Sequence, residues 1–211
     1  REPAPFEIVR GPRRGGGSLE DHFEALKLGF QRAPVPVHRI DTDTSGCLLL
    51  ARNPKSLKRF AKCFEDRVVE KRYLGVLSGV PAESEGTIEL SLSKISSAEK
   101  GWRMIAARKG KPSITHWRVL HEIDGRALLE FRPETGRTHQ VRVHMASIGH
   151  ALLGDPLYSR PPKPLRDLLK TADFRRQALH AQRLGFIHPV TGSECDFFSP
   201  IPADMAELLD R

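Results

Sequence analysis

The sequence predicts an α+β fold, built on a mixed, largely antiparallel central β-sheet that is flanked by helices and loops. Segments with the alternation typical of strands outnumber segments with helical spacing, and the two kinds rarely alternate along the chain. The chain has 211 residues, of which 39% are apolar, and this is enough for one core of good size. We therefore expect a single domain over residues 1–211.

Helices are expected where apolar residues recur at helical spacing between recognisable end signals. Ser18 can cap a helix that ends at Gly29. Asn53 followed by Pro54 is typical of a helix start, and apolar residues follow at helical spacing. Thr138 can cap a helix that runs to Ile148, and the segment ADMAELL predicts a short helix near the end of the chain.

Strands are expected where apolar and polar residues alternate or where a short apolar run lies between turn signals. The apolar run at 46–51 predicts a buried strand, and prolines make 33–37 extended. Alternation predicts further strands at 68–78, 86–92, 103–107, 113–123, 126–132, 178–187 and 194–198. The segment 159–176 is basic, and we expect it to be an exposed insertion.

Composition and charge restrict the class of protein. The balance of 34 basic and 26 acidic residues gives a net charge of +8, which favours a polyanionic partner such as RNA or DNA. No apolar run reaches the roughly 20 residues of a membrane-spanning helix, so we expect no membrane association. Cys47, Cys63 and Cys195 lie far apart without a C-x-x-C pair, which argues against disulfides or zinc and fits a reducing cytoplasm.

Three segments concentrate polar chemistry: HRIDTDTSG at 38–46, EKRY at 70–73, and RPETGRTHQVRVHMASIGHALLGDPLY at 132–158. Asp41 stands among many hydrogen-bond donors, although an acid there can also simply form an Asx-turn. Arg142 lies beside an apolar helix stripe, so it either reaches solvent or pairs with an acid such as Asp41. Tyr73 is either a core aromatic or a surface on which a nucleobase stacks.

In order and separation, these segments resemble the three signature blocks of the RluA-type RNA pseudouridine synthases, with similarity over about residues 18–202. The resemblance implies isomerisation of uridine to pseudouridine in ribosomal or transfer RNA, without a cofactor. It also implies that Asp41 is the catalytic aspartate, that Tyr73 stacks on the target uracil and that Arg142 pairs with Asp41. Arg39 takes the place of an arginine that fills the gap left by the extruded base.

The target base must leave its stack before it can react, so basic side chains are expected to hold the RNA. We expect Arg39, Arg137, Arg14 and Lys62 to bind RNA. Further basic candidates for phosphate contacts are Arg13, Lys55, Arg59, Lys109 and Lys163. Asp43 is a rival carboxylate two residues from Asp41, and only the resemblance prefers Asp41.

Several alternatives stay open at this point. A non-catalytic RNA-binding protein would keep the charge, and a nucleoside glycosidase would also place a carboxylate near C1′. His139, His144 and His150 are spaced on different helix faces, so we expect no metal site. The family that this chain resembles has a strand before the basic loop at 10–18, where this chain has only FEIVRGP, so that strand is expected to be truncated or missing. A monomer is the default expectation.

Overall fold

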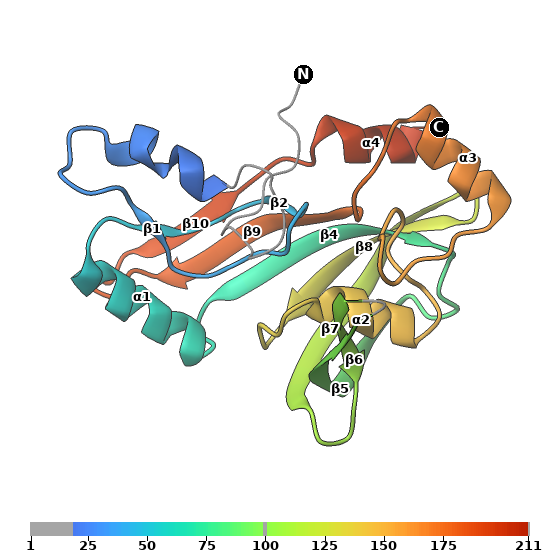
Figure 1. Ribbon diagram of the computed structural model, residues 1–211, viewed down its shortest axis with the longest axis horizontal. Coiled ribbons are helices and arrows are strands. Elements are labelled where there is room, and N and C mark those ends of the chain that lie inside the picture. Colours follow the sequence, from blue (N-terminus) through green and yellow to red (C-terminus); the bar gives the residue numbers. More distant parts are fainter. Residues whose placement is uncertain (1–18, 99–100, 211) are drawn as a thin grey trace.

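A mixed β-sheet of eight strands forms the centre of the computed structural model, which describes residues 19–98 and 101–210 (Figure 1). The strands lie in the order β10 (Glu194–Phe198), β9 (Leu179–Ile187), β4 (Glu70–Ser78), β8 (Arg126–Pro133), β7 (Lys111–Ile123), β5 (Glu85–Ser97) and β6 (Gly101–Ala106). All these neighbours are antiparallel, whereas the short β2 (Ser45–Gly46) pairs in parallel with β9. The expected α+β fold with a largely antiparallel, mixed sheet is therefore confirmed.

Helices cover the sheet in three places. They are α1 (Pro54–Glu65), α2 (Gln140–Ser147), α3 (Lys163–Thr171) and α4 (Ala203–Asp210), with a 3₁₀ helix at Leu19–Lys27. Figure 1 shows α1 beside β9 and β10, α2 at the hairpin strands β5–β7, and α3 and α4 together near the C-terminus. The start of α1 is as expected, since the Asn53 side chain accepts the Ser56 N–H at 2.8 Å.

Separate apolar clusters attach these helices to the sheet. Val141 and Met145 of α2 pack with Leu77, Leu129 and Phe131 of the central strands. The α1 cluster contains Val69, Leu184 and Phe186 together with partly buried side chains of the helix. A β1–β3 pair (Val35–Pro36 with Leu50–Ala51) lies outside the main sheet. Ile40, which precedes Asp41, packs against Ala181 of β9 in a further cluster.

Two structural expectations are wrong. The run at 46–51 is not one buried strand, because Ser45–Gly46 pairs with β9 while Leu50–Ala51 pairs with β1. The basic segment 159–176 is not simply an exposed insertion, because it contains α3 and buries Leu165 and Phe174 against α4.

Two helix starts also differ from the expectation. The first helix is a 3₁₀ helix, and its expected cap Ser18 lies outside the described residues. The helix expected from Thr138 begins at Gln140, because His139 adopts a left-handed conformation with φ of 53°. The expected truncated strand before residue 18 lies outside the described residues as well.

In the described part of the chain, no helix is both long enough and apolar enough to cross a membrane.

Candidate active site

The segment that contains Asp41 is anchored to the start of β9. Gly46 lies so close to β9 that a Cβ atom there would be 2.2 Å from the Ala181 carbonyl oxygen, and its φ of +107° also favours glycine. The Ser45 hydroxyl bonds His180 Nδ1 at 2.9 Å, and Gln177 donates to the Thr42 carbonyl and the Thr44 hydroxyl. These contacts fix the backbone on which the Asp41 carboxylate is presented.

Asp41 lies next to Arg142 and the N-terminus of α2. Its Oδ2 is 3.5 Å from Arg142 Nη1, and its Oδ1 accepts the His139 N–H at 3.4 Å. The N-terminal end of a helix carries partial positive charge, so both neighbours stabilise an anionic carboxylate. The structure thus brings Asp41 and Arg142 together across 101 residues of sequence.

Arg142 is held more tightly by Asp155 than by Asp41. Its Nε and Nη2 donate to the two carboxylate oxygens of Asp155 at 2.7 and 3.0 Å, and both side chains are buried. Asp155 also accepts the Leu157 and Tyr158 N–H groups, which makes it the centre of the turn. Nothing in the sequence indicated this ion pair between Arg142 and Asp155.

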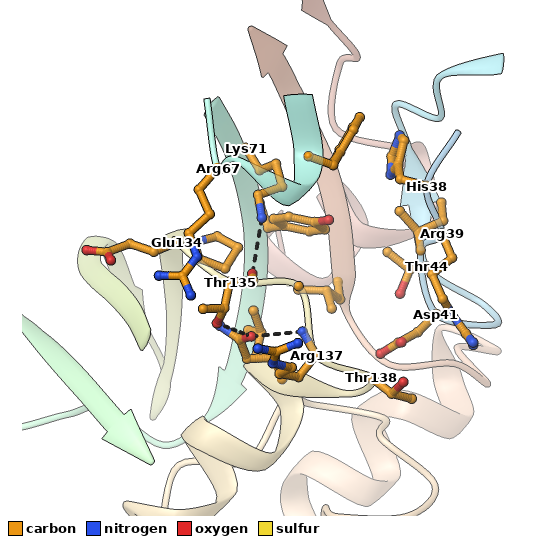
Figure 2. Close-up of a pocket in the computed structure, with 18 of the residues that line it drawn as sticks. His38, Arg39, Asp41, Thr44, Arg67, Lys71, Glu134, Thr135, Arg137 and Thr138 are labelled. Carbon is orange, nitrogen blue, oxygen red and sulfur yellow. Dashed lines mark hydrogen bonds between the residues drawn. The ribbon is translucent and has the colours of Figure 1, made fainter. Parts of the chain in front are cut away.

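A cavity of about 480 Å³ opens beside Asp41 (Figure 2). Its lining includes Arg39, Asp41, Lys71, Tyr73 and Arg137. Figure 2 shows Asp41 and Arg39 on one side of the cavity and Lys71 with Thr135 on the other. Arg142 is not part of the lining and reaches Asp41 from behind it. A volume of this size is typical of small-molecule sites and can hold one nucleoside.

Tyr73 enters this cavity from β4. The pairing register shifts between Arg72 and Tyr73, and such a bulge redirects the side chain that follows it. The ring packs against Ile40 and Ala181 as well as the main core. Burial, followed by the negative charge of Asp41, raises the pKa of Tyr73 above its usual range, so the phenol stays neutral.

Gln140 organises the loop on the other side of Asp41, a role that the sequence did not predict. Its Oε1 accepts the Thr135 hydroxyl and the Arg137 N–H at 2.6 and 3.0 Å. Its Nε2 donates to Ile114 O and Thr115 Oγ1 of β7 at 2.9 Å each. The only signal was a glutamine inside an otherwise recognisable motif, with nothing to show that it is buried.

The expected RNA contacts differ in position. Arg39 and Arg137 line the cavity, and Arg137 Nε also donates to Pro112 O at 3.3 Å. Lys62 lies on the exposed side of α1 at a second cavity, where Glu65 and Asp66 pair with it. Arg14 lies outside the described residues. The structure therefore brings Arg39 and Arg137, but not Lys62, to the Asp41 cavity.

The three histidines considered as metal ligands point to different partners. His139 bonds the Tyr158 hydroxyl at 3.0 Å, His144 bonds Ser113 Oγ at 2.9 Å, and His150 lies against Gly79. Within residues 19–98 and 101–210, no three His, Cys, Asp or Glu side chains gather closely enough to hold a metal ion.

Residues 18–147 match the family model described as RNA pseudouridylate synthase. The chain belongs to this family. An uncharacterised RNA pseudouridine synthase of Zymomonas mobilis is 44% identical over 205 residues, which cover 95% of this chain and 88% of the relative. The ribosomal large subunit pseudouridine synthase D of the same organism is 43% identical, over 86% of this chain and 57% of the relative.

Other matches agree with the family. An uncharacterised RNA pseudouridine synthase of Bacillus subtilis is 41% identical, over 84% of this chain and 55% of the relative. The chain thus spans little more than half the length of two of the curated relatives it matches. Human RNA pseudouridylate synthase domain containing 1 superposes with a TM-score of 0.68 at 30% identity, covering 87% of this chain and 74% of that one.

Human RNA pseudouridylate synthase domain containing 4 superposes with a TM-score of 0.78 at 23% identity, which supports the fold. It covers 99% of this chain and 86% of that one. Together, the family match and the named relatives confirm the resemblance to RluA-type synthases drawn from the sequence.

We expect the stability of the protein to depend on pH, because three of its histidines are wholly or partly buried. Burial lowers the pKa of His38, His139 and His144 from 6.5 to about 4, so the folded state binds fewer protons than the unfolded state between these values. The contribution of these histidines to the free energy of unfolding is therefore fully present above pH 6.5 and is lost as the pH falls towards 4. Each histidine accounts for about 1–3 kcal/mol of this loss. Urea denaturation from pH 8 to pH 4.5 measures this loss.

His144→Gln provides the control for this pH effect. His144 is fully buried, and within the described residues nothing bonds its Nδ1 atom. The variant removes one titrating group, so its stability should decrease less between pH 6.5 and 4.5 than that of the original protein. An unchanged dependence on pH would show that His144 does not remain neutral in the folded state.

Proposed function

We propose that this chain isomerises uridine to pseudouridine within an RNA strand. The observation that carries the proposal is the Asp41 carboxylate, held by Arg142 at 3.5 Å at the edge of a cavity that also contains Tyr73. The reaction breaks the N1–C1′ bond of the nucleotide and joins C5 of the same uracil to C1′. Cleavage places positive character on the sugar, which a nearby carboxylate stabilises.

Each side chain of the site then has a distinct role. Asp41 either attacks C1′ or removes a proton from C2′, and both routes need an ionised carboxylate. Arg142 is the positioning residue for Asp41, and it is itself oriented by the buried Asp155. Tyr73 offers a neutral aromatic face on which the uracil stacks. Arg39, which is exposed at the cavity, occupies the gap left by the extruded base.

Structured ribosomal or transfer RNA is the proposed substrate class. A relative 43% identical to this chain is named as a ribosomal large subunit pseudouridine synthase, and the net charge of +8 favours a polyanion. The isomerisation involves no net redox change, so we propose an enzyme without a cofactor or metal. We further propose a single catalytic domain that acts as a monomer in the cytoplasm, consistent with three free cysteines.

The test is incubation of the protein with transcribed large-subunit ribosomal RNA and transfer RNA, followed by pseudouridine mapping. An isomerase forms pseudouridine without changing the mass of the RNA and without releasing uracil. Release of free uracil would instead identify a nucleoside glycosidase. RNA binding without either product would identify a catalytically silent RNA-binding protein, and both outcomes contradict the proposal.

RNA affinity is expected to decrease steeply with salt, because cations at the cavity release counterions from the phosphates. Arg137→Gln should lower the slope of log affinity against log salt concentration by about one. Filter binding at several salt concentrations measures the slope. Arg175→Gln serves as the control, since Arg175 is exposed, pairs with Asp173 and does not line the cavity. Equal slopes for Arg137→Gln and the original protein would remove Arg137 from the interface.

A further inference from the structure

Lys71 is a cation placed inside the Asp41 cavity without a compensating acid. Its side chain, on β4, is half-buried and lines the cavity. Its Nζ donates to the Thr135 carbonyl oxygen at 3.1 Å. In the part of the chain that the structure describes, no carboxylate lies within ion-pair distance of this nitrogen. Arg72, the next residue on β4, differs in this respect, because Glu70 and Glu130 both pair with it.

This arrangement costs free energy. Burial, followed by repulsion from Arg67, lowers the pKa of Lys71 to about 8. An ammonium group has three donors, and the Thr135 carbonyl uses one of them. Two N–H donors therefore remain for a ligand in the cavity. An unpaired cation in a cleft is typical of a functional group, because an anionic or carbonyl-bearing ligand can supply the missing partner.

Lys71 and Asp41 lie at opposite ends of the same cavity. Figure 2 shows Lys71 beside Thr135, across from Asp41 and Arg39. Asp41 must reach the sugar in the proposed reaction, whereas Tyr73 lines the same cavity and offers a stacking surface. A uracil on Tyr73 with its sugar at Asp41 would direct a carbonyl edge away from Asp41. That edge is the part of the nucleotide that Lys71 can reach.

A contact between Lys71 and the uracil would stabilise the negative charge that the base carries during the reaction. When the N1–C1′ bond breaks, its electron pair stays with the uracil, and the negative charge spreads from N1 to O2, O4 and C5. C5 then donates an electron pair to C1′ and loses its proton, while N1 gains one. The uracil is therefore more negative between the two bonds than before or after them. A fixed cation beside a carbonyl oxygen stabilises that intermediate stage more than the bound substrate.

We propose that Lys71 is a second catalytic group, which donates a hydrogen bond to a carbonyl oxygen of the target uracil and stabilises the base while it is detached from the sugar. This inference rests on the proposed function. The two sides of the cavity then stabilise opposite charges. Asp41 stabilises the positive charge on the sugar, and Lys71 stabilises the negative charge on the base. A contact of Lys71 with an RNA phosphate is the alternative that the experiment distinguishes.

The first test compares Lys71→Met with the original protein in single-turnover reactions on an RNA stem-loop that carries a mapped uridine. We expect the rate at saturating enzyme to decrease about 100-fold, since removal of one such donor costs about 10²–10³ in rate. RNA affinity should change little. Lys170→Met, at an exposed position of α3, should react at the original rate. A loss confined to affinity and to its salt slope would show a phosphate contact and overturn the proposal.

The second test changes the RNA instead of the protein. The mapped uridine is replaced by 2-thiouridine or by 4-thiouridine, because sulfur accepts hydrogen bonds more weakly than oxygen. One of these substitutions should slow the original protein several-fold but leave Lys71→Met unaffected, since the contact is already absent. Equal slowing of both proteins by each thio-RNA would overturn the proposal. Where Lys71→Met does not fold, an unchanged rate of the original protein on both thio-RNAs would also overturn the proposal.

These outcomes separate the two hypotheses. If the original protein forms no pseudouridine from any RNA tested, the proposed function fails. If it forms pseudouridine and Lys71→Met reacts within about threefold of it, only the role of Lys71 fails. Lys71→Arg keeps a cation and should retain more activity than Lys71→Met.

Discussion

Asp41→Asn is expected to abolish pseudouridine formation, with a decrease in rate of roughly 10³-fold or more, as for the loss of a reacting group in other enzymes. The amide has nearly the same shape as the carboxylate but no negative charge. It can neither attack C1′ nor accept a proton from C2′, and it cannot stabilise positive charge on the sugar. Single-turnover assays of pseudouridine formation, with the mapped RNA and excess protein, measure the loss.

The same substitution should leave the fold intact. Arg142 keeps its two short hydrogen bonds to Asp155 when Asp41 becomes neutral, so no buried charge loses its main partner. We therefore expect the urea midpoint of Asp41→Asn to be close to that of the original protein. A variant that folds, binds RNA and does not react would locate the effect in the chemical step.

Asp43→Asn is the matched control for Asp41→Asn. Asp43 lies two residues away, does not line the cavity, and has a left-handed backbone with φ of 69°, which asparagine tolerates well. Its carbonyl oxygen accepts Arg176 Nη1 at 3.1 Å, and this backbone contact survives the substitution. Near-normal activity of Asp43→Asn is expected. If Asp41→Asn reacts normally and Asp43→Asn does not, the catalytic assignment is wrong.

The sequence predicts the sheet well because its strands alternate and are separated by strong turn signals. Strands β7 and β8, for example, were expected at 113–123 and 126–132 and are found at Lys111–Ile123 and Arg126–Pro133. The start of α1 was equally clear, since Asn53 and Pro54 form a recognisable cap. These features depend on local residue order alone, which is visible in a single sequence.

Features that depend on distant partners were harder to predict. The run at 46–51 looks like one strand because it is apolar, but Leu48 packs with Ile40 while Cys47 and Leu49 pack with the α1 cluster. Helix α3 has leucines at 165, 168 and 169, which is a helical spacing that the basic residues around it concealed. In both cases the neighbouring elements decide the conformation, and no local pattern identifies those neighbours.

The candidate site, like the fold, could be predicted only in part from the sequence. The resemblance brings Asp41, Tyr73 and Arg142 into one site, and the structure places them around or behind one cavity. The sequence did not reveal that Asp155 is the stronger partner of Arg142, since no spacing rule links the two residues. Lys71 was visible only as part of the EKRY segment, and its lack of an acidic partner became apparent only in three dimensions.

Asp155→Asn is expected to destabilise the protein by about 3–5 kcal/mol, because the buried Arg142 loses its closer compensating charge and keeps only Asp41 at 3.5 Å. The side chains of Arg142 and Asp155 are 4% and 0% exposed, so water cannot replace the lost partner. The amide also replaces one acceptor with a donor, which faces an arginine that only donates. Urea denaturation measures the change in the free energy of unfolding, and single-turnover assays measure the accompanying loss of activity.

Arg183 and Asp196 provide a matched comparison on the surface. Their two hydrogen bonds, at 2.6 and 2.8 Å, have the same paired geometry as those of Arg142 and Asp155, but both side chains are accessible to water. Asp196→Asn should therefore change the urea midpoint far less than Asp155→Asn. Equal effects of the two substitutions would show that burial does not determine the strength of the Arg142 pair.

A double variant separates the stability of this pair from its role in the reaction. Replacing both partners with apolar residues, as Arg142→Met with Asp155→Leu, removes the unpaired charge and should recover much of the stability lost in Asp155→Asn. It also removes the cation beside Asp41, so activity should stay low although the protein folds. Recovery of activity together with stability would mean that Arg142 serves only the fold, and the Asp41 carboxylate would then be oriented by the His139 N–H and the start of α2 alone.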